Sequence, residues 1–135
     1  GFVIPKIAMK VAAIYKQEEF DPLVLGNLDI VRDWGWAYEY VDAIYAVTVL
    51  ANEPSDFVIA SSFPVSLQQL VTCAFESVGL SATQWVKSNS AFFRNGEVLE
   101  VSGNADRISA DLGWKASVFG TEVVRKLVNW HIKNG

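Results

Sequence analysis

The chain alternates short apolar runs with longer segments whose apolar residues recur every three or four positions. The strongest such segment begins at Ser66, where SLQQ places a serine three positions before Gln69, which is a capping box, and Val65 is positioned as a hydrophobic staple. Apolar residues follow at helical spacing: Leu67, Leu70, Val71, Ala74, Phe75 and Val78. Gly79 can end this helix. Helical segments separated by short apolar runs predict an α/β fold.

Four further helices are predicted from spacing and helix-end residues. The first covers about residues 5 to 17, because Pro5 suits the first turn. The second starts at Asp33 or Trp34 and should be a mostly buried helix of about fifteen residues. The third runs from Asn104 or Asp106 to Gly113, and the fourth from Thr121 to Lys133. The chain should therefore contain about five helices.

Short apolar runs predict strands of mixed direction. Leu23–Leu25 should be a strand that enters a loop at Gly26, and residues 57–61 form a nearly continuous apolar run. Such a run is typical of a parallel strand covered on both faces. Thr83–Val86 and Glu97–Val101 are predicted as two more short strands around a polar loop. Without an internal repeat or linker, one compact unit is expected over residues 1–135.

Composition excludes several classes of protein. At 135 residues and 51% hydrophobic, the chain has enough apolar surface for one domain. Its net charge of −4 and its singly scattered 11 Lys and Arg make nucleic acid an unsuitable partner. Cys73 is the only cysteine, which fits a reducing compartment and a cytoplasmic location. The sequence predicts no membrane span, and no secretory signal is expected at its start.

The segment Leu25–Ala43 carries the most specific motif, LGNLDIVRDWGWAYEYVDA. It resembles the signature of GDP-mannose 4,6-dehydratases, which are extended short-chain dehydrogenase/reductase enzymes of the NAD-dependent epimerase/dehydratase family. The resemblance extends over nearly all of the chain. It implies a C-terminal substrate-binding portion without a complete Rossmann domain, and GDP-mannose or a related nucleotide sugar as the ligand.

Arg32 is the first candidate ligand-binding residue. The resemblance implies that this arginine contacts the nucleotide part of the substrate. Its position before a predicted helix would add the partial positive charge of the helix N-terminus, and a guanidinium suits phosphate oxygens. The alternative from the bare sequence is a surface arginine paired with Asp33 or with another neighbour.

A second motif spans Phe92–Trp114, FFRNGEVLEVSGNADRISADLGW. It is similar to the extended-family pattern RPxE or RPGD followed by LGW, which implies that Arg94 contacts the diphosphate and Glu97 the nucleoside. Asn95 replaces the proline of the family, so one fixed φ angle is lost. The alternative is a tight hairpin in which Asn95-Gly96 is the turn and the two charged side chains are exposed.

The segment FVIPKI at residues 2–7 resembles FVTRKI of the dehydratases. Lys6 would then contact the nucleotide, while Ile4-Pro5 replaces a threonine and an arginine of the family. A solvated lysine in the first turn is the alternative. By the same resemblance, Leu25 and Gly26 could offer backbone contacts to the base.

The aromatic side chains and the single histidine are expected to have structural roles. The five tryptophans should mostly pack in a core or an interface. His131 lies on the apolar side of a predicted helix, with no second histidine or carboxylate at metal-ligand spacing, so no metal site is expected.

Catalytic residues and a cofactor site are not expected in this chain. It contains neither a GxxGxxG turn nor a tyrosine followed four positions later by lysine. By resemblance, NADP would be needed only by a complete family enzyme. Two hypotheses follow: a GDP-sugar-binding portion that is not catalytic on its own, or a structural module that has lost nucleotide-sugar binding. A homo-oligomer is expected in either case, because the apolar run at 57–61 would need new partners.

Overall fold

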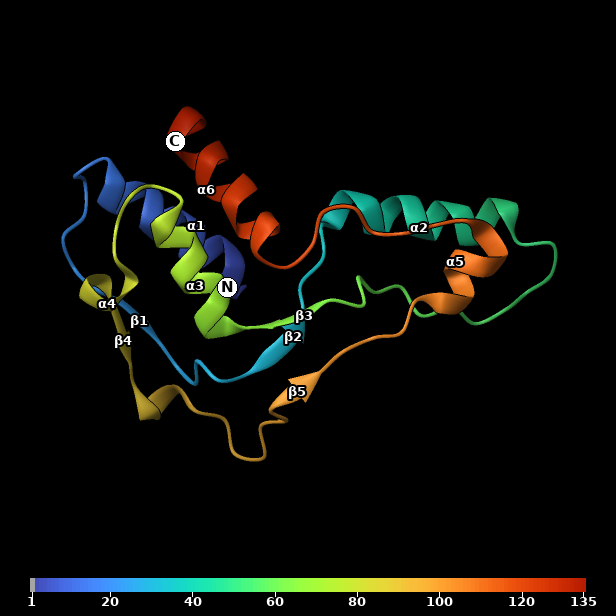
Figure 1. Cartoon of the computed structure of the whole chain (residues 1–135), viewed down its shortest axis with the longest axis horizontal. Helices are drawn as coiled ribbons and strands as arrows, with labels where there is room; N and C mark the ends of the chain where they lie inside the picture. Colours follow the sequence, from blue (N-terminus) through green and yellow to red (C-terminus); the bar gives the residue numbers. More distant parts are fainter. Residues whose placement is uncertain (1) are drawn as a thin grey trace.

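The computed structural model describes residues 2–135 and contains short strands between helices (Figure 1). The helices are α1 (Val3–Tyr15), α2 (Ala37–Leu50), α3 (Leu67–Glu76), α4 (Ala82–Trp85), α5 (Asp106–Leu112) and α6 (Thr121–Asn134), with a 3-10 turn η1 (Ser90–Phe92). The strands are β1 (Leu23–Leu25), β2 (Val31–Asp33), β3 (Pro64–Ser66), β4 (Val86–Ser88) and β5 (Glu100–Val101). The predicted α/β class with short mixed strands is confirmed, with six helices in place of about five.

The elements form two lobes of unequal size joined by the short strands (Figure 1). In the larger lobe α1, α3 and α6 pack around a core that includes Ile7, Leu70 and Phe75, all fully buried. In the smaller lobe α2 lies beside α5. Its core has only three buried residues, Ala43, Ile108 and Trp114. Most of the buried apolar surface therefore lies in the larger lobe.

Helix α3 begins with the predicted capping box. The Ser66 hydroxyl accepts a hydrogen bond from the Gln69 amide at 3.1 Å, and the Ser66 amide donates to the Gln69 side chain at 2.8 Å. Both bonds satisfy amides that the helix itself leaves without partners. Predicted features elsewhere are also confirmed: β1 covers Leu23–Leu25, and α5 ends at Gly113, whose φ is +71°.

The strands form two small sheets. β1 pairs in parallel with β4, and β2 lies between antiparallel β3 and parallel β5. Strand β2 was not predicted, because Val31–Asp33 is too short to show a period and is held by its two neighbours. Its position brings residues 31–33 beside residues 99–101, so the two sequence motifs meet at this sheet.

The prediction of a strand at residues 57–61 is wrong. The segment is extended but unpaired, and among residues 2–135 no backbone-to-backbone hydrogen bond joins residues 53–60 to another segment. Both edges of β2 are already occupied by β3 and β5. Ser61 is held instead by a side chain, since its amide donates to the Asp33 carboxylate at 2.8 Å.

The predictions for α2 were also wrong in two respects. The helix starts at Ala37 and not at Asp33 or Trp34, because residues 31–33 belong to β2 and Gly35 bridges to Phe119. It is not mostly buried, since only Ala43 and Ala46 are. Apolar residues occur on every side of this helix, so spacing alone could not tell which side would be covered.

Two short strands were predicted with the wrong boundaries. Residues 82–85 form α4, and the strand follows at Val86–Ser88, so the predicted strand at 83–86 is wrong. The predicted strand at 97–101 shrinks to Glu100–Val101, because β2 offers only a short parallel neighbour. Such short segments carry too few residues for a clear period.

Candidate functional site

Five of the six residues predicted to bind ligand line one hollow. A cavity of about 480 Å³ lies between the end of β1, the start of β2 and the turn after η1. Its lining includes Leu25, Gly26, Arg32, Arg94 and Glu97. A cavity of this size suits a small-molecule ligand. The two arginines are 62 positions apart in the chain, and the meeting of β2 with the segment before β5 brings them together.

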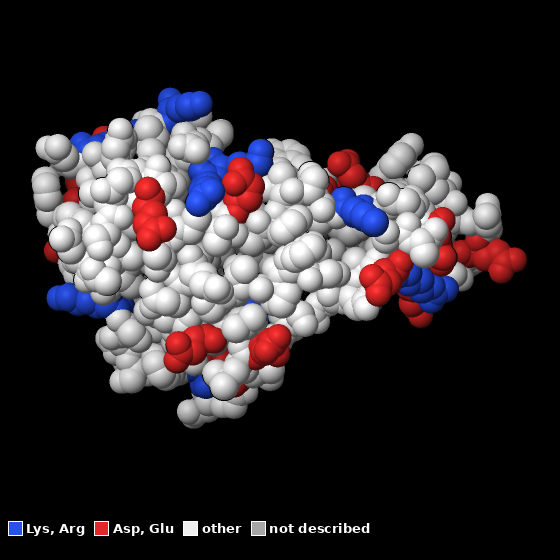
Figure 2. Space-filling model, viewed as in Figure 1, with Lys and Arg blue, Asp and Glu red and all other residues white. Residues whose placement is uncertain are grey.

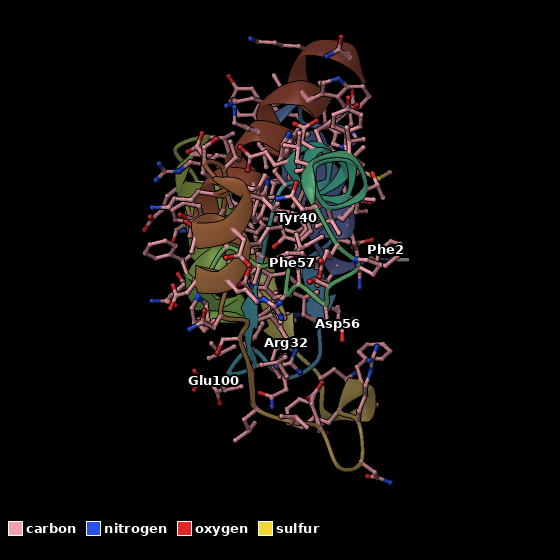
Figure 3. The ribbon with its side chains drawn as sticks, turned by 90° about the vertical axis from the view of Figure 1, so that its right-hand side faces the viewer. Phe2, Arg32, Tyr40, Asp56, Phe57 and Glu100 are labelled. Atoms are coloured by element: carbon pink, nitrogen blue, oxygen red, sulfur yellow. The ribbon has the colours of Figure 1, made fainter. Side chains whose placement is uncertain are left out.

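Arg32 is partly engaged within the protein. Its Nη1 donates to the carbonyls of Val31 at 2.7 Å and Leu99 at 3.1 Å, and Nη2 donates to the carbonyl of Val98 at 2.8 Å. Figure 3 labels Arg32 and Glu100 in the lower half of that view, below the helices. A guanidinium has five N–H donors, so these three bonds leave two for a ligand. Arg32 therefore also ties β2 to the residues that precede β5.

The prediction that Arg32 lies just before a helix is wrong. The residue lies in β2, and Trp34, Gly35 and Trp36 separate that strand from the first residue of α2. Arg32 is therefore not next to the N-terminus of α2 in the sequence. The alternative pairing with Asp33 is also not found among residues 2–135, because Asp33 accepts its hydrogen bonds from Tyr40, Ser61 and Ser62.

Arg94 and Glu97 are the two ends of a tight turn. The Glu97 amide donates to the Arg94 carbonyl at 3.2 Å, and Gly96 has a φ of +71°. A positive φ at the third position of a turn favours glycine. The turn does not form a hairpin, because the strand after it pairs with β2. Arg94 is exposed, and within residues 2–135 no hydrogen bond or salt bridge engages its side chain.

Leu25 and Gly26 line the cavity at the end of β1. The Leu25 carbonyl accepts from the Asn89 amide at 2.8 Å, and the Gly26 carbonyl accepts from the Ser88 hydroxyl at 2.9 Å. A Cβ atom at Gly26 would lie 2.8 Å from the carbonyl oxygen of Phe92. Position 26 therefore requires glycine, because the backbone at Phe92 comes so close. The carbonyls of Leu25 and Gly26 both already accept a hydrogen bond within the protein.

Lys6 lines a neighbouring hollow instead of the shared one. Its Nζ donates to the carbonyl of Val24 at 2.8 Å. The neighbouring hollow has a volume of about 690 Å³ and also includes the Lys10–Glu19 ion pair, whose atoms are 3.1 Å apart. Phe2 and Phe92 line both hollows and lie between them. The structure thus brings Lys6 close to the other five residues but not into the same cavity.

Comparisons with known proteins identify the family of this chain. A family model described as GDP-mannose 4,6 dehydratase matches residues 1–127. The chain belongs to the GDP-mannose 4,6 dehydratase family. Curated relatives include GDP-mannose 4,6 dehydratases of Drosophila melanogaster, 33% identical over 98% of this chain, and of Homo sapiens, 32% identical over 96%. The chain spans 38% and 39% of the length of these two relatives.

Solved structures show the same fold at lower sequence identity. RMD from Pseudomonas aeruginosa complexed with NADPH matches with a TM-score of 0.85 and 17% identity, over 99% of this chain and 43% of that one. UDP-glucose 4-epimerase from Bifidobacterium longum in complex with NAD+ and UDP matches with a TM-score of 0.75 and 17% identity, over 95% and 39%. The family fold is thus that of extended short-chain dehydrogenase/reductase enzymes, of which this chain covers a part.

No strand-to-helix connection among residues 2–135 is rich in glycine. Within residues 2–135, two strand-to-helix connections contain a glycine, Gly35 between β2 and α2 and Gly103 between β5 and α5, and each contains only one. A dinucleotide site needs several glycines so that the backbone can approach the pyrophosphate. In the same described range no group of three or more His, Cys, Asp or Glu side chains comes together to hold a metal.

The charges on the surface of this family member are dispersed. Figure 2 shows Lys and Arg scattered among Asp and Glu over the face it presents, without a broad area of one sign. No helix of the described residues is long and apolar enough to cross a membrane.

Sequence reasoning missed the aromatic part of the cavity lining. Phe2, Trp34 and Phe92 line the hollow beside the two arginines. Trp34 is fixed there, because its Nε1 donates to the Val65 carbonyl at 3.0 Å. Trp34 belongs to the RDW motif, but all five tryptophans were predicted to serve mostly in packing. Phe92 lies two positions before Arg94 of the RNGE turn, and this closeness in the sequence could have marked it as part of the lining.

Proposed function

We propose that this chain is the GDP-sugar-binding portion of a GDP-mannose 4,6-dehydratase-like enzyme, and that it is not catalytic on its own. The observation that carries the proposal is the shared cavity of Arg32, Arg94 and Glu97. A nucleotide diphosphate presents two anionic phosphates, which planar guanidinium groups bind through paired hydrogen bonds. Family membership supports a GDP-sugar as the ligand.

Each side chain of the cavity has its own role in the proposal. Arg94 is exposed and has no partner for its guanidinium in the described residues 2–135, so it can approach the diphosphate without losing an internal contact. Arg32 lines the same cavity and has two N–H donors left with which it would bind the same group. Glu97, which is half-buried, can accept hydrogen bonds from a base or ribose. Phe92 and Trp34 offer apolar surface to a flat base.

Calorimetric titration with GDP-mannose tests this proposal. The wild-type chain should bind, and Arg94→Ala should weaken binding by about 10-fold to 100-fold, because a charge-assisted hydrogen bond contributes roughly 1.5–3 kcal/mol. Lys133→Ala is the control, since it removes one positive charge from the exposed end of α6. Folded wild-type protein that takes up no GDP-mannose at millimolar concentration would refute the proposal.

Selectivity for the base can be measured in the same way. GDP-mannose should bind more tightly than UDP-glucose, and Glu97→Gln should reduce that difference if Glu97 contacts the nucleoside. Equal binding of both sugars by wild type would contradict assignment of the cavity to GDP-sugars, while leaving diphosphate binding intact.

A structural module without ligand binding is the second candidate function. The observation in its favour is that three donors of Arg32 are used on the carbonyls of Val31, Val98 and Leu99. Ile4-Pro5 and Asn95 also depart from the family pattern in the two motifs that contain Lys6 and Arg94. In that case Arg94→Ala and Lys133→Ala would behave alike, with no measurable change in affinity for any nucleotide sugar.

The proposal also covers the cellular location and the oligomeric state of the chain. We propose a cytoplasmic location, supported by the single buried Cys73 and the resulting lack of any internal disulfide. We also propose that the chain forms a homo-oligomer, since residues 57–61 leave apolar side chains and unpaired backbone at the surface, including Val58.

A further inference from the structure

Arg94 lies in a segment that no buried side chain holds in place. Residues 89–99 connect β4 to β5, and Figure 1 shows this connection running below the helices. None of the residues 88–97 is buried, and even Phe92 and Phe93 are 59% and 49% exposed. Segments with few buried apolar contacts open easily. The position of Arg94 in the cavity therefore depends on hydrogen bonds.

Those hydrogen bonds reach the rest of the molecule only at the two ends of the connection. Within residues 2–135, every hydrogen bond that involves residues 90–97 stays inside residues 89–97. At the β5 end, Arg32 donates to the carbonyls of Val98 and Leu99. At the β4 end, the Asn89 amide donates to the Leu25 carbonyl at 2.8 Å. The turn that carries Arg94 lies between these two anchors.

Asn89 links the β4 anchor to the turn η1. Its side-chain Oδ1 accepts from the Ala91 amide at 2.9 Å, and its carbonyl accepts from the Phe92 amide at 3.0 Å. An asparagine that accepts from the backbone two residues further on stabilises a turn. Asn89 is thus bound to β1 on one side and is the N-cap of η1 on the other.

The turn η1 rests directly on Gly26. The space that a Cβ atom would need at Gly26 is limited by the Phe92 carbonyl oxygen, 2.8 Å away, so the two backbones are in contact. The Ser88 hydroxyl donates to the Gly26 carbonyl at 2.9 Å and holds the end of β4 at the same place. Gly26, Phe92 and Arg94 all line the cavity. The conformation of η1 therefore sets where the cavity wall continues toward Arg94.

We propose that Asn89 is a positioning residue for ligand binding, whose side-chain cap on η1 holds Arg94 and Glu97 in the cavity. Asn89 does not line the cavity itself, so it acts through the turn and not through the ligand. A segment that is already ordered before binding loses less conformational entropy when the ligand arrives, which increases affinity. The inference rests on the proposed function for the identity of the ligand, whereas the order of the turn can be measured without one.

NMR relaxation of the full 135-residue chain without ligand is the first test. Backbone order parameters of residues 90–97 should be close to those of β1 in wild type and should fall toward about 0.6 in Asn89→Ala. Asn89→Ser should restore them, because serine can accept the same hydrogen bond. Asn104→Ala is the matched control and should leave residues 90–97 unchanged. Asn104 also accepts from the amide two positions on, that of Asp106 at 2.7 Å, but lies outside the cavity.

Calorimetric titration with GDP-mannose is the second test. Asn89→Ala should weaken binding by about 3-fold to 10-fold, the effect expected for loss of one capping hydrogen bond, and Asn89→Ser should recover most of it. In an Arg94→Ala background the same Asn89 substitution should weaken binding clearly less, because the arginine that it positions is absent. Asn104→Ala should bind like wild type.

The results separate this inference from the proposed function. Unchanged order parameters in Asn89→Ala overturn the inference, whether or not the wild type binds a ligand. If wild type binds GDP-mannose, equal affinity of Asn89→Ala, or a loss that Asn89→Ser does not restore, also overturns it and leaves the proposed function intact. A wild type that binds no GDP-mannose refutes the proposed function, and the order parameters alone then decide whether Asn89 holds the turn.

Discussion

The carboxylate of Asp33 organises the junction between the two lobes. It accepts hydrogen bonds from the amides of Ser61 and Ser62, both at 2.8 Å, and from the Tyr40 hydroxyl at 3.3 Å. Ser62 has a φ of +64°, which is unfavourable for a residue with a side chain, so its position depends on this carboxylate. Burial and the neighbouring charge of Asp33 raise the pKa of Tyr40 to about 12. Tyr40 therefore remains a neutral donor over the physiological pH range.

Gly35→Ala should destabilise the protein by about 1–3 kcal/mol, because overpacking displaces a neighbouring side chain. A Cβ atom at Gly35 would overlap the Tyr40 ring, which is partly buried and bonded to Asp33. Chemical denaturation would measure the loss. In a Tyr40→Leu background the same glycine substitution should cost clearly less, so additive effects of the two changes would argue against this mechanism.

A second carboxylate, that of Glu39, fixes the segment before α6. It accepts hydrogen bonds from the amides of Ser117 at 3.1 Å and Val118 at 3.0 Å, and from the Ser117 hydroxyl. Burial taken alone would raise the pKa of Glu39 and is the largest single effect. The hydrogen bonds from Ser117 and Val118 together outweigh it, so the pKa of Glu39 is lowered below the ordinary value of 4.5.

The stability that Glu39 contributes should depend on acid pH. Because its folded-state pKa is lowered, this contribution is present above pH 4.5 and is lost as the pH falls through the folded value. Denaturation midpoints between about pH 6 and pH 3 should fall more steeply for wild type than for Glu39→Gln. Glu53→Gln, which changes an exposed carboxylate after α2, should keep the wild-type slope. Parallel curves for wild type and Glu39→Gln would contradict the assignment.

At the scale of elements, β5 shows how a very short strand is kept in place. It has only two residues and pairs with β2 along Val31 and Arg32. The guanidinium of Arg32 adds bonds to the two carbonyls just before β5, those of Val98 and Leu99. Side-chain bonds thus extend a strand pairing that is too short to be stable by itself.

Arg32→Ala should loosen residues 93–101 while leaving the larger lobe folded. Hydrogen bonds to a charged group contribute about 1.5–3 kcal/mol, so local opening should increase by roughly 10-fold or more. Limited proteolysis would detect faster cleavage in this segment. Arg32→Lys keeps the charge but not the planar fork, and should fall between wild type and Arg32→Ala. Unchanged cleavage in Arg32→Ala would show that strand pairing suffices.

For the whole molecule, the unequal cores of the two lobes predict unequal stability. The buried core cluster of the larger lobe contains fourteen residues, whereas the cluster between α2 and α5 contains three. Local unfolding starts where few apolar contacts are buried. The connection between the lobes consists of extended segments, which transmit little cooperativity.

Hydrogen exchange should resolve the two lobes. Amides of α1 and α3 should exchange only with global unfolding, and those of α2 and α5 should exchange through a less costly opening. Equal protection of both lobes would refute the idea that core size sets their stability.

The candidate site was predicted from motifs that lie far apart in the chain, and the fold explains why they lie close together. The RDW and RNGE motifs meet because β2 pairs with β5, a contact that no local pattern indicates. Lys6 falls into the neighbouring hollow because Phe2 and Phe92 stand between. The aromatic lining went unassigned because a tryptophan or phenylalanine has the same appearance in a sequence whether it lines a core or a cavity.

Features set by neighbouring residues were determined by the sequence alone. The capping box of α3, the strand at Leu23–Leu25 and the left-handed glycine after α5 need only a few consecutive residues to form. The tertiary structure alone decided that residues 57–61 stay unpaired and that α2 leaves most of its large apolar side chains exposed. Strand pairing and burial depend on which distant segments are available as partners, and an apolar run reads the same whether or not a partner is present.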